Sequence, residues 1–210
     1  MTVTVSVEHD GAESARKGLE LCVAAGGVAI FPADGLYGLA CDPLNQAAIE
    51  RIHQIKGRDD GKPSAVLYFS PLAMRELVDG LGDRTRAAVG ALLPGPVTLV
   101  VNNPERRYPL ACREDPERLG VRLIDGPLAG MIWPVFQTSA NRSGEPAPAI
   151  FADVPRSILS AVDVAIDGGT LAGSPSTVVD VTSLDSDGKW TILRQGGMPA
   201  EELRERFNAV

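Results

Sequence analysis

Short apolar runs bounded by glycine, proline or other turn residues most strongly constrain what this chain can fold into. They include GVAIFP (27–32), SAVLYF (64–69), VTLVV (97–101) and LGVRLI (119–124). Apolar runs of four to eight residues between turn signals are typical of buried β-strands. Segments with apolar residues at helical spacing lie next to these runs, for example at 12–25, before the first run, and at 45–56, between the first and the second. Buried strands mixed with amphipathic helices predict a sheet covered by helices.

The two clearest helical segments have defined ends and inward faces. Gly26 and Gly27 end the first helix, and Asn45 is the N-cap of the second. The inward face of the first is predicted to be Ala15, Leu19, Cys22 and Val23, and that of the second Ala48, Ile49, Ile52 and Ile55.

The remaining segments complete an α+β (α/β-like) architecture. We expect helices at 71–79, with Pro71 in the first turn, and at 84–93, 127–133, 154–161 and 200–207. Strands are expected within 134–141, 163–169, 176–183 and 189–196, and the short links of this last third favour antiparallel pairing. The total is about seven strands and about seven helices. No repeat or linker divides the chain, so we expect residues 1–210 to form a single domain with a twisted, mixed parallel and antiparallel sheet.

Composition narrows the classes of function. The 210 residues are 44% hydrophobic and carry a net charge of −7, which disfavours an extended nucleic-acid surface but allows a local anion site. Three cysteines without a CxxC pair predict neither a disulfide framework nor a zinc site, and they favour a reducing, cytoplasmic setting. The N-terminal residues MTVTVSVEHD lack a signal-peptide pattern, and no apolar run is long enough for a membrane span.

Four segments join apolar strands to small polar residues, which is where α/β sheets usually present ligand sites. They are FPADGLYGLACD (31–42), the cationic loop with Lys56, Arg58 and Lys62, TSANRSGEPAP (138–148), and the pair GSPSTVVD (173–180) and LRQGG (193–197). Each also has an ordinary structural interpretation. Lys56 and Arg58 suit the end of a helix dipole, and Ser139 and Asn141 suit a turn.

Two arginines are harder to explain by structure alone. Arg122 lies inside GVRLI and Arg194 inside TILRQG, and a charge within an apolar strand needs a partner or a bound anion. Neither a GxxxxGK[ST] loop nor a GxGxxG motif is present, and two histidines make a histidine-based metal site or triad improbable. Arginine and lysine with neutral serine, threonine and asparagine donors suit phosphate or carboxylate.

Taken together, these segments make the sequence resemble the YrdC/TsaC family of threonylcarbamoyl-AMP synthases, in its short single-domain form. The resemblance rests on FPADGLYGLACDP, KGR followed by KP, PGPVTLVV, GVRL, TSANRSG, DGG, STVVD and LRQG, in that order over about 20–200. It implies a twisted sheet around a deep, positively lined concavity. It also implies that ATP, with Mg²⁺ carried on the nucleotide, reacts with L-threonine and bicarbonate to give threonylcarbamoyl-AMP and pyrophosphate, and that a separate transferase complex then modifies tRNA.

The resemblance also implies roles for individual residues. Lys56 and Arg58 would act on the phosphates in catalysis, and no protein metal ligands are implied. The ATP-binding residues would be Lys56, Arg58, Lys62, Ser139, Asn141 and Arg194. The threonine-binding residues would be Gly35, Tyr37, Arg122, Thr138 and Ser176.

The sequence departs from the family pattern on the amino-acid side. Many members have Thr-Asp/Glu-Thr where this chain has Ala33-Asp34-Gly35, and some have histidine at the position of Leu67. These departures leave open a paralogue that adenylates a different carbamate or carbamoyl substrate. A non-catalytic RNA-binding module of the same fold is a further alternative, although the negative charge predicts weak or no direct tRNA binding. If the loop accepts a β-branched residue, Gly35→Thr is expected to tighten threonine binding; a positive φ at Gly35 would oppose that.

Overall fold

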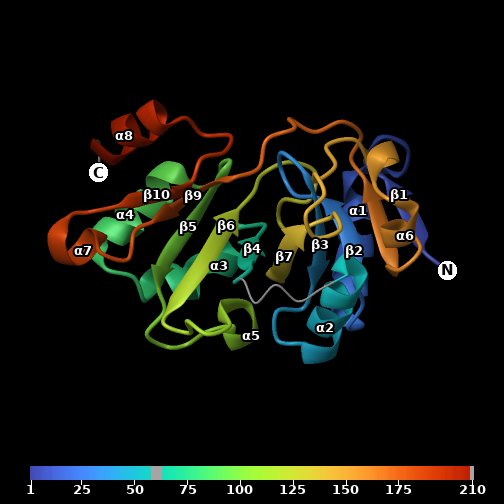
Figure 1. Cartoon of the computed structure of the whole chain (residues 1–210), viewed down its shortest axis with the longest axis horizontal. Coiled ribbons are helices and arrows are strands. Elements are labelled where there is room, and N and C mark those ends of the chain that lie inside the picture. Colours follow the sequence, from blue (N-terminus) through green and yellow to red (C-terminus); the bar gives the residue numbers. More distant parts are fainter. Residues whose placement is uncertain (58–62, 209–210) are drawn as a thin grey trace.

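The computed structural model describes residues 1–57 and 63–208. Within them ten strands form one sheet, in the order β1-β8-β2-β3-β7-β4-β6-β5-β9-β10 (Figure 1). The strands are β1 (Val3–Ser6), β2 (Ala29–Pro32), β3 (Tyr37–Cys41), β4 (Ala65–Tyr68), β5 (Val97–Asn102), β6 (Arg118–Leu123), β7 (Val135–Ser139), β8 (Val164–Asp167), β9 (Thr177–Asp180) and β10 (Thr191–Arg194). The predicted mixed sheet is confirmed, with more strands than the sequence suggested.

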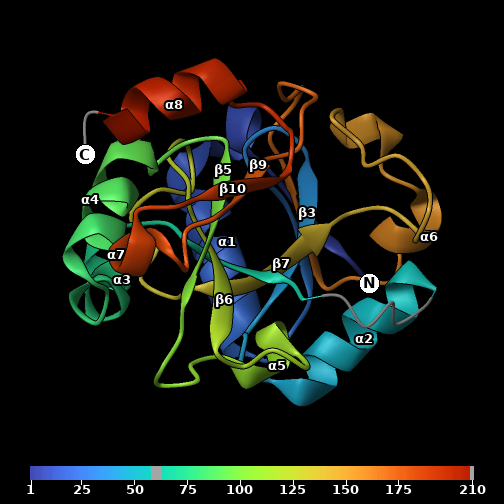
Figure 2. The ribbon, with the colours of Figure 1, turned by 60° about the vertical axis from the view of Figure 1, so that its left-hand side comes forward.

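Helices pack beside both ends of the sheet. They are α1 (Val7–Ala24), α2 (Gln46–Lys56), α3 (Pro71–Asp79), α4 (Asp83–Leu92), α5 (Pro109–Cys112), α6 (Arg156–Leu159), α7 (Leu184–Asp187) and α8 (Ala200–Asn208), with a 3₁₀ turn at Phe151–Asp153. α1 contacts β1, β8 and β2, whereas α4 contacts β5, α7 and α8. Figure 1 shows α4 near the β10 end of the sheet and α1 near the β1 end, and Figure 2 shows the strong twist of the strands. Among the described residues, no helix combines the length and apolarity that crossing a membrane requires.

The central strands are apolar on both faces because both faces are buried. Ile30, Val66 and Tyr68 belong to one core cluster, whereas Phe31 and Leu67 belong to a second. Successive side chains of a strand point to opposite faces, so these neighbours feed different cores. The predicted inward residues of α1 are all buried, and those of α2 are buried except for the partly buried Ile55. Asn45 caps α2 by accepting a hydrogen bond from the Ala48 N–H at 3.0 Å.

Several predicted elements need correction. Residues 127–133 form turns instead of a helix, because Gly126 and Gly130 have φ values of 98° and 90°. β1 and β3 were missed, as were the short helices α5 and α7. In the last third β9 and β10 are antiparallel as predicted. The expectation is wrong for β8, which pairs in parallel with β1 and β2, and β9 also pairs in parallel with β5.

Candidate active site

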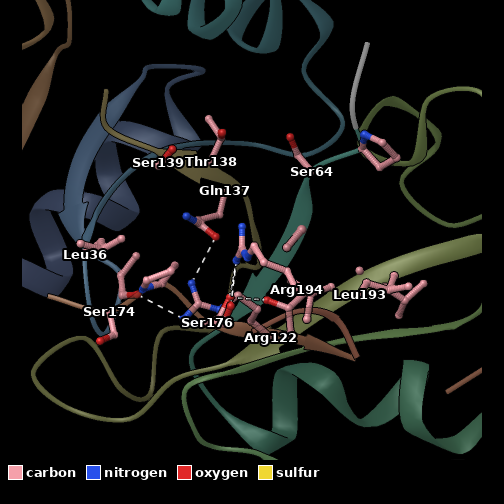
Figure 3. A pocket seen from close by; sticks show the side chains of 18 of the residues that line it. Leu36, Ser64, Arg122, Gln137, Thr138, Ser139, Ser174, Ser176, Leu193 and Arg194 are labelled. Carbon is pink, nitrogen blue, oxygen red and sulfur yellow. Dashed lines mark hydrogen bonds between the residues drawn. The ribbon is translucent and has the colours of Figure 1, made fainter. Parts of the chain in front are cut away.

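A cavity of about 400 Å³ lies where the central strands meet the β9–β10 hairpin and the turn between β2 and β3. Figure 3 shows side chains from these distant segments pointing into it, among them Arg122, Gln137, Ser176 and Arg194. Its charged lining residues are Arg118, Arg122, Arg194 and Asp115. The volume falls in the range of small-molecule sites, and the excess of arginine makes it suited to an anionic ligand.

Arg122 is the most deeply placed charge of the cavity. It is only 4% exposed because it lies near the end of β6, a strand flanked by β4 and β5 on its two sides. Its guanidinium donates to the Gln137 side chain at 3.3 Å and to the Ala33 carbonyl at 3.2 Å. The Asp34 carboxylate lies 3.6 Å away. Burial lowers the pKa of Arg122 to about 10, whereas Asp34 acts in the opposite direction. Its Nε–H has no hydrogen-bond partner among the described residues, so the group has capacity left for a ligand.

Arg194 approaches the cavity from β10 and is fastened to Ser176. Its Nη2 donates to the Ser176 carbonyl at 2.8 Å and lies 3.3 Å from the hydroxyl. The Ser176 hydroxyl in turn lies 2.7 Å from the Thr98 hydroxyl of β5. Burial lowers the pKa of Arg194, although the residue as a whole is exposed to solvent. Because it is exposed, Arg194 can reach a ligand at the cavity mouth.

Thr177 joins the two C-terminal segments that carry these residues. Its hydroxyl donates to the Met198 carbonyl at 2.8 Å and accepts from the backbone N–H groups of Gly196 and Met198 at 3.0 and 3.1 Å. The side chain is fully buried. Gly196 has no room for a side chain, because a Cβ would lie 2.3 Å from the Pro175 carbonyl oxygen. The Thr177 hydroxyl therefore adds to the β9–β10 pairing and to the Arg194–Ser176 hydrogen bond in holding the STVVD and LRQGG segments together.

Lys56, Ser139 and Asn141 form a second polar group beside the cavity. The Lys56 ammonium donates to the carbonyls of Ser139 and Asn141 at 2.6 and 3.1 Å. The Ser139 hydroxyl donates to the Asn141 side-chain oxygen at 2.5 Å. Ser139 and Thr138 line the cavity, so Lys56 fixes the turn that supplies these hydroxyl groups. Arg58 and Lys62, the other predicted cations, lie outside the described residues.

Tyr37 and Gly35 are placed close to the cavity, but neither presents a free polar side chain to it. Tyr37 lines the cavity, yet its hydroxyl donates to the Gly169 carbonyl at 2.8 Å and accepts from the Gly168 N–H at 3.0 Å. Burial raises the pKa of Tyr37 to about 12. A Cβ on Gly35 would lie 2.0 Å from the Ser174 carbonyl oxygen. The condition set for a benefit of Gly35→Thr, a loop that accepts a β-branched residue, is therefore not met; the obstacle is this contact and not a positive φ, which Gly35 does not have.

Several polar residues in or beside the cavity were missed from the sequence, among them Arg118, Gln137 and Asp34. Arg118 shares a face of β6 with Arg122, and strand alternation would have indicated it. Gln137 directly precedes the predicted Thr138. Asp34 belongs to an Asp-Gly dipeptide between apolar runs, a strong hairpin signal that would also have located β3. Within residues 1–57 and 63–208, no cluster of three histidine, cysteine or acidic residues could hold a metal ion.

A mixed sheet that surrounds a cation-lined cavity defines an α+β protein built to bind a small anion. Residues 22–196 match the Sua5/YciO/YrdC family model, described as "Telomere recombination", and the chain belongs to this family. The threonylcarbamoyl-AMP synthase of Nitrosococcus oceani is 35% identical over 166 residues, covering 75% of this chain and 88% of that protein. The enzyme of the same name from Thiobacillus denitrificans is 34% identical over 178 residues, with 81% and 93% coverage.

Solved structures share the fold. Pyrococcus abyssi Sua5 complexed with L-threonine superposes with a TM-score of 0.81 at 26% identity, covering 98% of this chain. This chain spans 60% of that Sua5 chain. E. coli YciO superposes with a TM-score of 0.80 at 20% identity, with 97% and 98% coverage. The second likeness supports the fold alone.

Proposed function

We propose that this protein is an L-threonylcarbamoyladenylate synthase, a nucleotidyltransferase that makes threonylcarbamoyl-AMP and pyrophosphate from ATP, L-threonine and bicarbonate. The observation that carries the proposal is the convergence of Arg122, Arg194 and the hydroxyl groups of Thr138, Ser139 and Ser176 on one cavity. Two relatives at least 34% identical bear the name of this activity.

The chemistry requires cations in fixed positions more than it requires an acid–base pair. The amine of threonine captures bicarbonate as a carbamate with loss of water, and a carbamate oxygen attacks the α-phosphorus of ATP as pyrophosphate leaves. Both reacting groups are anionic, so the barrier lies mainly in charge repulsion and alignment. Mg²⁺ would arrive on the nucleotide and neutralise part of the phosphate charge.

The residues divide into two groups along the cavity. Arg194, Ser139 and Asn141 would bind ATP, with Lys56 acting on the phosphates and on the Ser139 turn; Arg58 and Lys62 are proposed to complete this group. Arg122 would bind the carboxylate of threonine, where its buried charge gains a partner. Thr138 and Ser176 would supply neutral donors, and Gly35 and the ring of Tyr37 would shape the amino-acid pocket.

The cellular role follows from the product. A mixed anhydride of a carbamate and AMP is an activated donor, so we infer that a separate transferase complex passes its threonylcarbamoyl group to tRNA. We further infer that residues 1–210 act as one domain in the cytoplasm, where the three buried thiols stay reduced, and that direct tRNA binding is weak.

Pyrophosphate release with ATP, bicarbonate and each of the twenty amino acids tests the proposal. We expect release that depends on bicarbonate and is strongest with L-threonine. Release with another amino acid, and none with threonine, would favour a paralogue that adenylates a different carbamate. Gly35 motivates this second candidate, because the Ser174 carbonyl oxygen leaves no room there for the side chain that many family members have. No release with any amino acid contradicts both.

A further inference from the structure

The turn between β2 and β3 places a charged residue in an unfavourable backbone conformation at the edge of the cavity. The Ala33 N–H donates to the Leu36 carbonyl at 3.0 Å, which leaves Asp34 and Gly35 as a two-residue hairpin loop. Asp34 has φ of 76°, which is uncommon for residues with a side chain, although aspartate and asparagine adopt it more readily than most. Glycine would suit that position better, yet the glycine is its neighbour.

The neighbouring contacts fix this arrangement. Gly35 cannot carry a side chain, because a Cβ would collide with the Ser174 carbonyl oxygen. The Gly35 carbonyl accepts a hydrogen bond from the Gly173 N–H at 2.9 Å. The turn is thus held against the 173–174 segment, and the conformational strain falls on the residue that carries the carboxylate. Strained residues of this kind concentrate at ligand sites.

The Asp34 carboxylate faces the deepest cation of the cavity and keeps accepting capacity. Its Oδ2 lies 3.6 Å from Nη2 of Arg122. Within the described residues it accepts no hydrogen bond, and its side chain is 38% exposed. Ala33 and Leu36, on either side of the two-residue loop, line the cavity. Two nearby charges act on the pKa of Arg122: the opposite charge of Asp34 raises it and the like charge of Arg194 lowers it.

We propose that Asp34 recognises the ammonium group of the amino-acid substrate while Arg122 binds its carboxylate. The inference rests on the proposed function, because that function requires an amino acid in this cavity. An α-amino acid carries its two opposite charges on neighbouring groups, and Asp34 and Arg122 present the complementary charges side by side. The pair therefore selects a zwitterion over a plain carboxylic acid, and Asp34 is a specificity-determining residue.

A merely positioning role for Asp34 makes a different prediction. If the carboxylate only oriented Arg122, its loss would weaken the binding of every carboxylate by the same factor. Recognition of the ammonium weakens only ligands that carry one. L-threonine and (R)-3-hydroxybutyrate differ by the amino group alone, so their two dissociation constants separate the two roles.

The test uses Asp34→Asn, because asparagine keeps the shape of aspartate and tolerates positive φ. Calorimetry on the full chain gives the Kd of each ligand. We expect the Kd of L-threonine to rise roughly tenfold to a hundredfold, as for loss of one charge-assisted contact, whereas the Kd of (R)-3-hydroxybutyrate stays within about threefold. Asp34→Gly relieves the φ strain and should show the same split. Asp79→Asn, the same charge change on exposed α3, should alter neither constant.

Equal weakening of both ligands in Asp34→Asn, or unchanged threonine binding, overturns the inference. Pyrophosphate release, measured in the same protein preparation, tests the proposed function separately. A parent protein that binds L-threonine without releasing pyrophosphate contradicts the synthase activity. The comparison of the two dissociation constants still tests the role of Asp34 in that case. A parent that binds neither ligand contradicts both proposals.

Discussion

At the residue scale, Lys56 has two roles that one substitution can separate. Its ammonium holds the carbonyls of Ser139 and Asn141, and under the proposed function it also faces the phosphates. We expect Lys56→Ala to cost about 2 to 4 kcal/mol in the transition state, which lowers kcat/KM by roughly 30-fold to 1,000-fold. Pyrophosphate release measured at several ATP concentrations checks this.

The control for Lys56→Ala is Lys17→Ala on the exposed face of α1, which removes the same charge away from the cavity. A Lys56→Ala protein with parental kcat/KM would remove the phosphate role and leave Lys56 as a structural fastening of the turn.

At Gly35, close packing opposes the sequence-based expectation that a threonine would tighten substrate binding. Gly35→Thr restores the hydroxyl that many family members have, but its Cβ would lie 2.0 Å from the Ser174 carbonyl oxygen. Relief of that contact requires the backbone of the turn to move. We expect the free energy of unfolding to fall by about 1 to 3 kcal/mol and the affinity for threonine to fall with it. Urea unfolding of Gly35→Ala and Gly35→Thr measures the loss of stability. Tighter threonine binding by Gly35→Thr would contradict the expected loss of affinity.

At the element scale, the site depends on how β9 and the segment after β10 are joined through Thr177. Thr177→Val keeps the shape but leaves the N–H groups of Gly196 and Met198 without their acceptor, whereas the Met198 carbonyl keeps its hydrogen bond from the Gln195 side-chain amide. Each unsatisfied buried group costs roughly 1 to 3 kcal/mol. We expect the free energy of unfolding to drop by at least about 2 kcal/mol, and ATP binding to weaken because Arg194 and Ser176 lie on the same two segments.

The comparison for Thr177→Val is Thr177→Ser, which keeps the hydroxyl and should restore most of both losses. Chemical denaturation and an ATP titration provide the two measurements. Parental values for Thr177→Val together with losses for Thr177→Ser would show that the methyl group, and not the hydrogen bonds, holds the segments together.

Elements with a strong local signal could be predicted from the sequence, whereas elements defined by distant contacts could not. Helix α2 could be predicted because Asn45 marks its N-terminus and the spacing of the isoleucines marks its buried face. β1 was missed because it is a short edge strand that pairs with β8, more than 150 residues away. Likewise Arg122 and Arg194 could be singled out as charges within apolar strands. The Asp34-Gly35 dipeptide signals the hairpin locally, but the contact of Arg122 with Asp34 joins segments 88 residues apart, so no local pattern could reveal that contact.

At the scale of the whole molecule, the acidic net charge and the cationic cavity are compatible because a few arginines outnumber the acidic residues locally. The chain carries 20 lysines and arginines against 27 acidic residues, yet three arginines line the cavity with one aspartate. An extended RNA surface requires basic residues across a face, and its binding falls steeply with salt. A small anionic ligand requires only the local field, which agrees with a nucleotide and not with a long RNA as the bound partner.

Ligand binding should therefore stabilise the whole sheet. The cavity is lined by residues from Ala33 to Arg194, so a bound nucleotide would connect strands from the centre of the sheet to its β10 edge. At a concentration of 100 Kd a ligand adds about 2.7 kcal/mol to the free energy of unfolding. For a chain of this size that corresponds to a rise in Tm of about 5 to 10 °C. Thermal unfolding with ATP, and with adenosine at the same concentration, measures the effect. Because the cavity selects for anionic groups, we expect ATP to raise Tm much more than adenosine does, and Arg194→Ala to remove most of the difference. Equal shifts for the two ligands would show that the nucleoside alone is recognised and that the arginines serve another purpose.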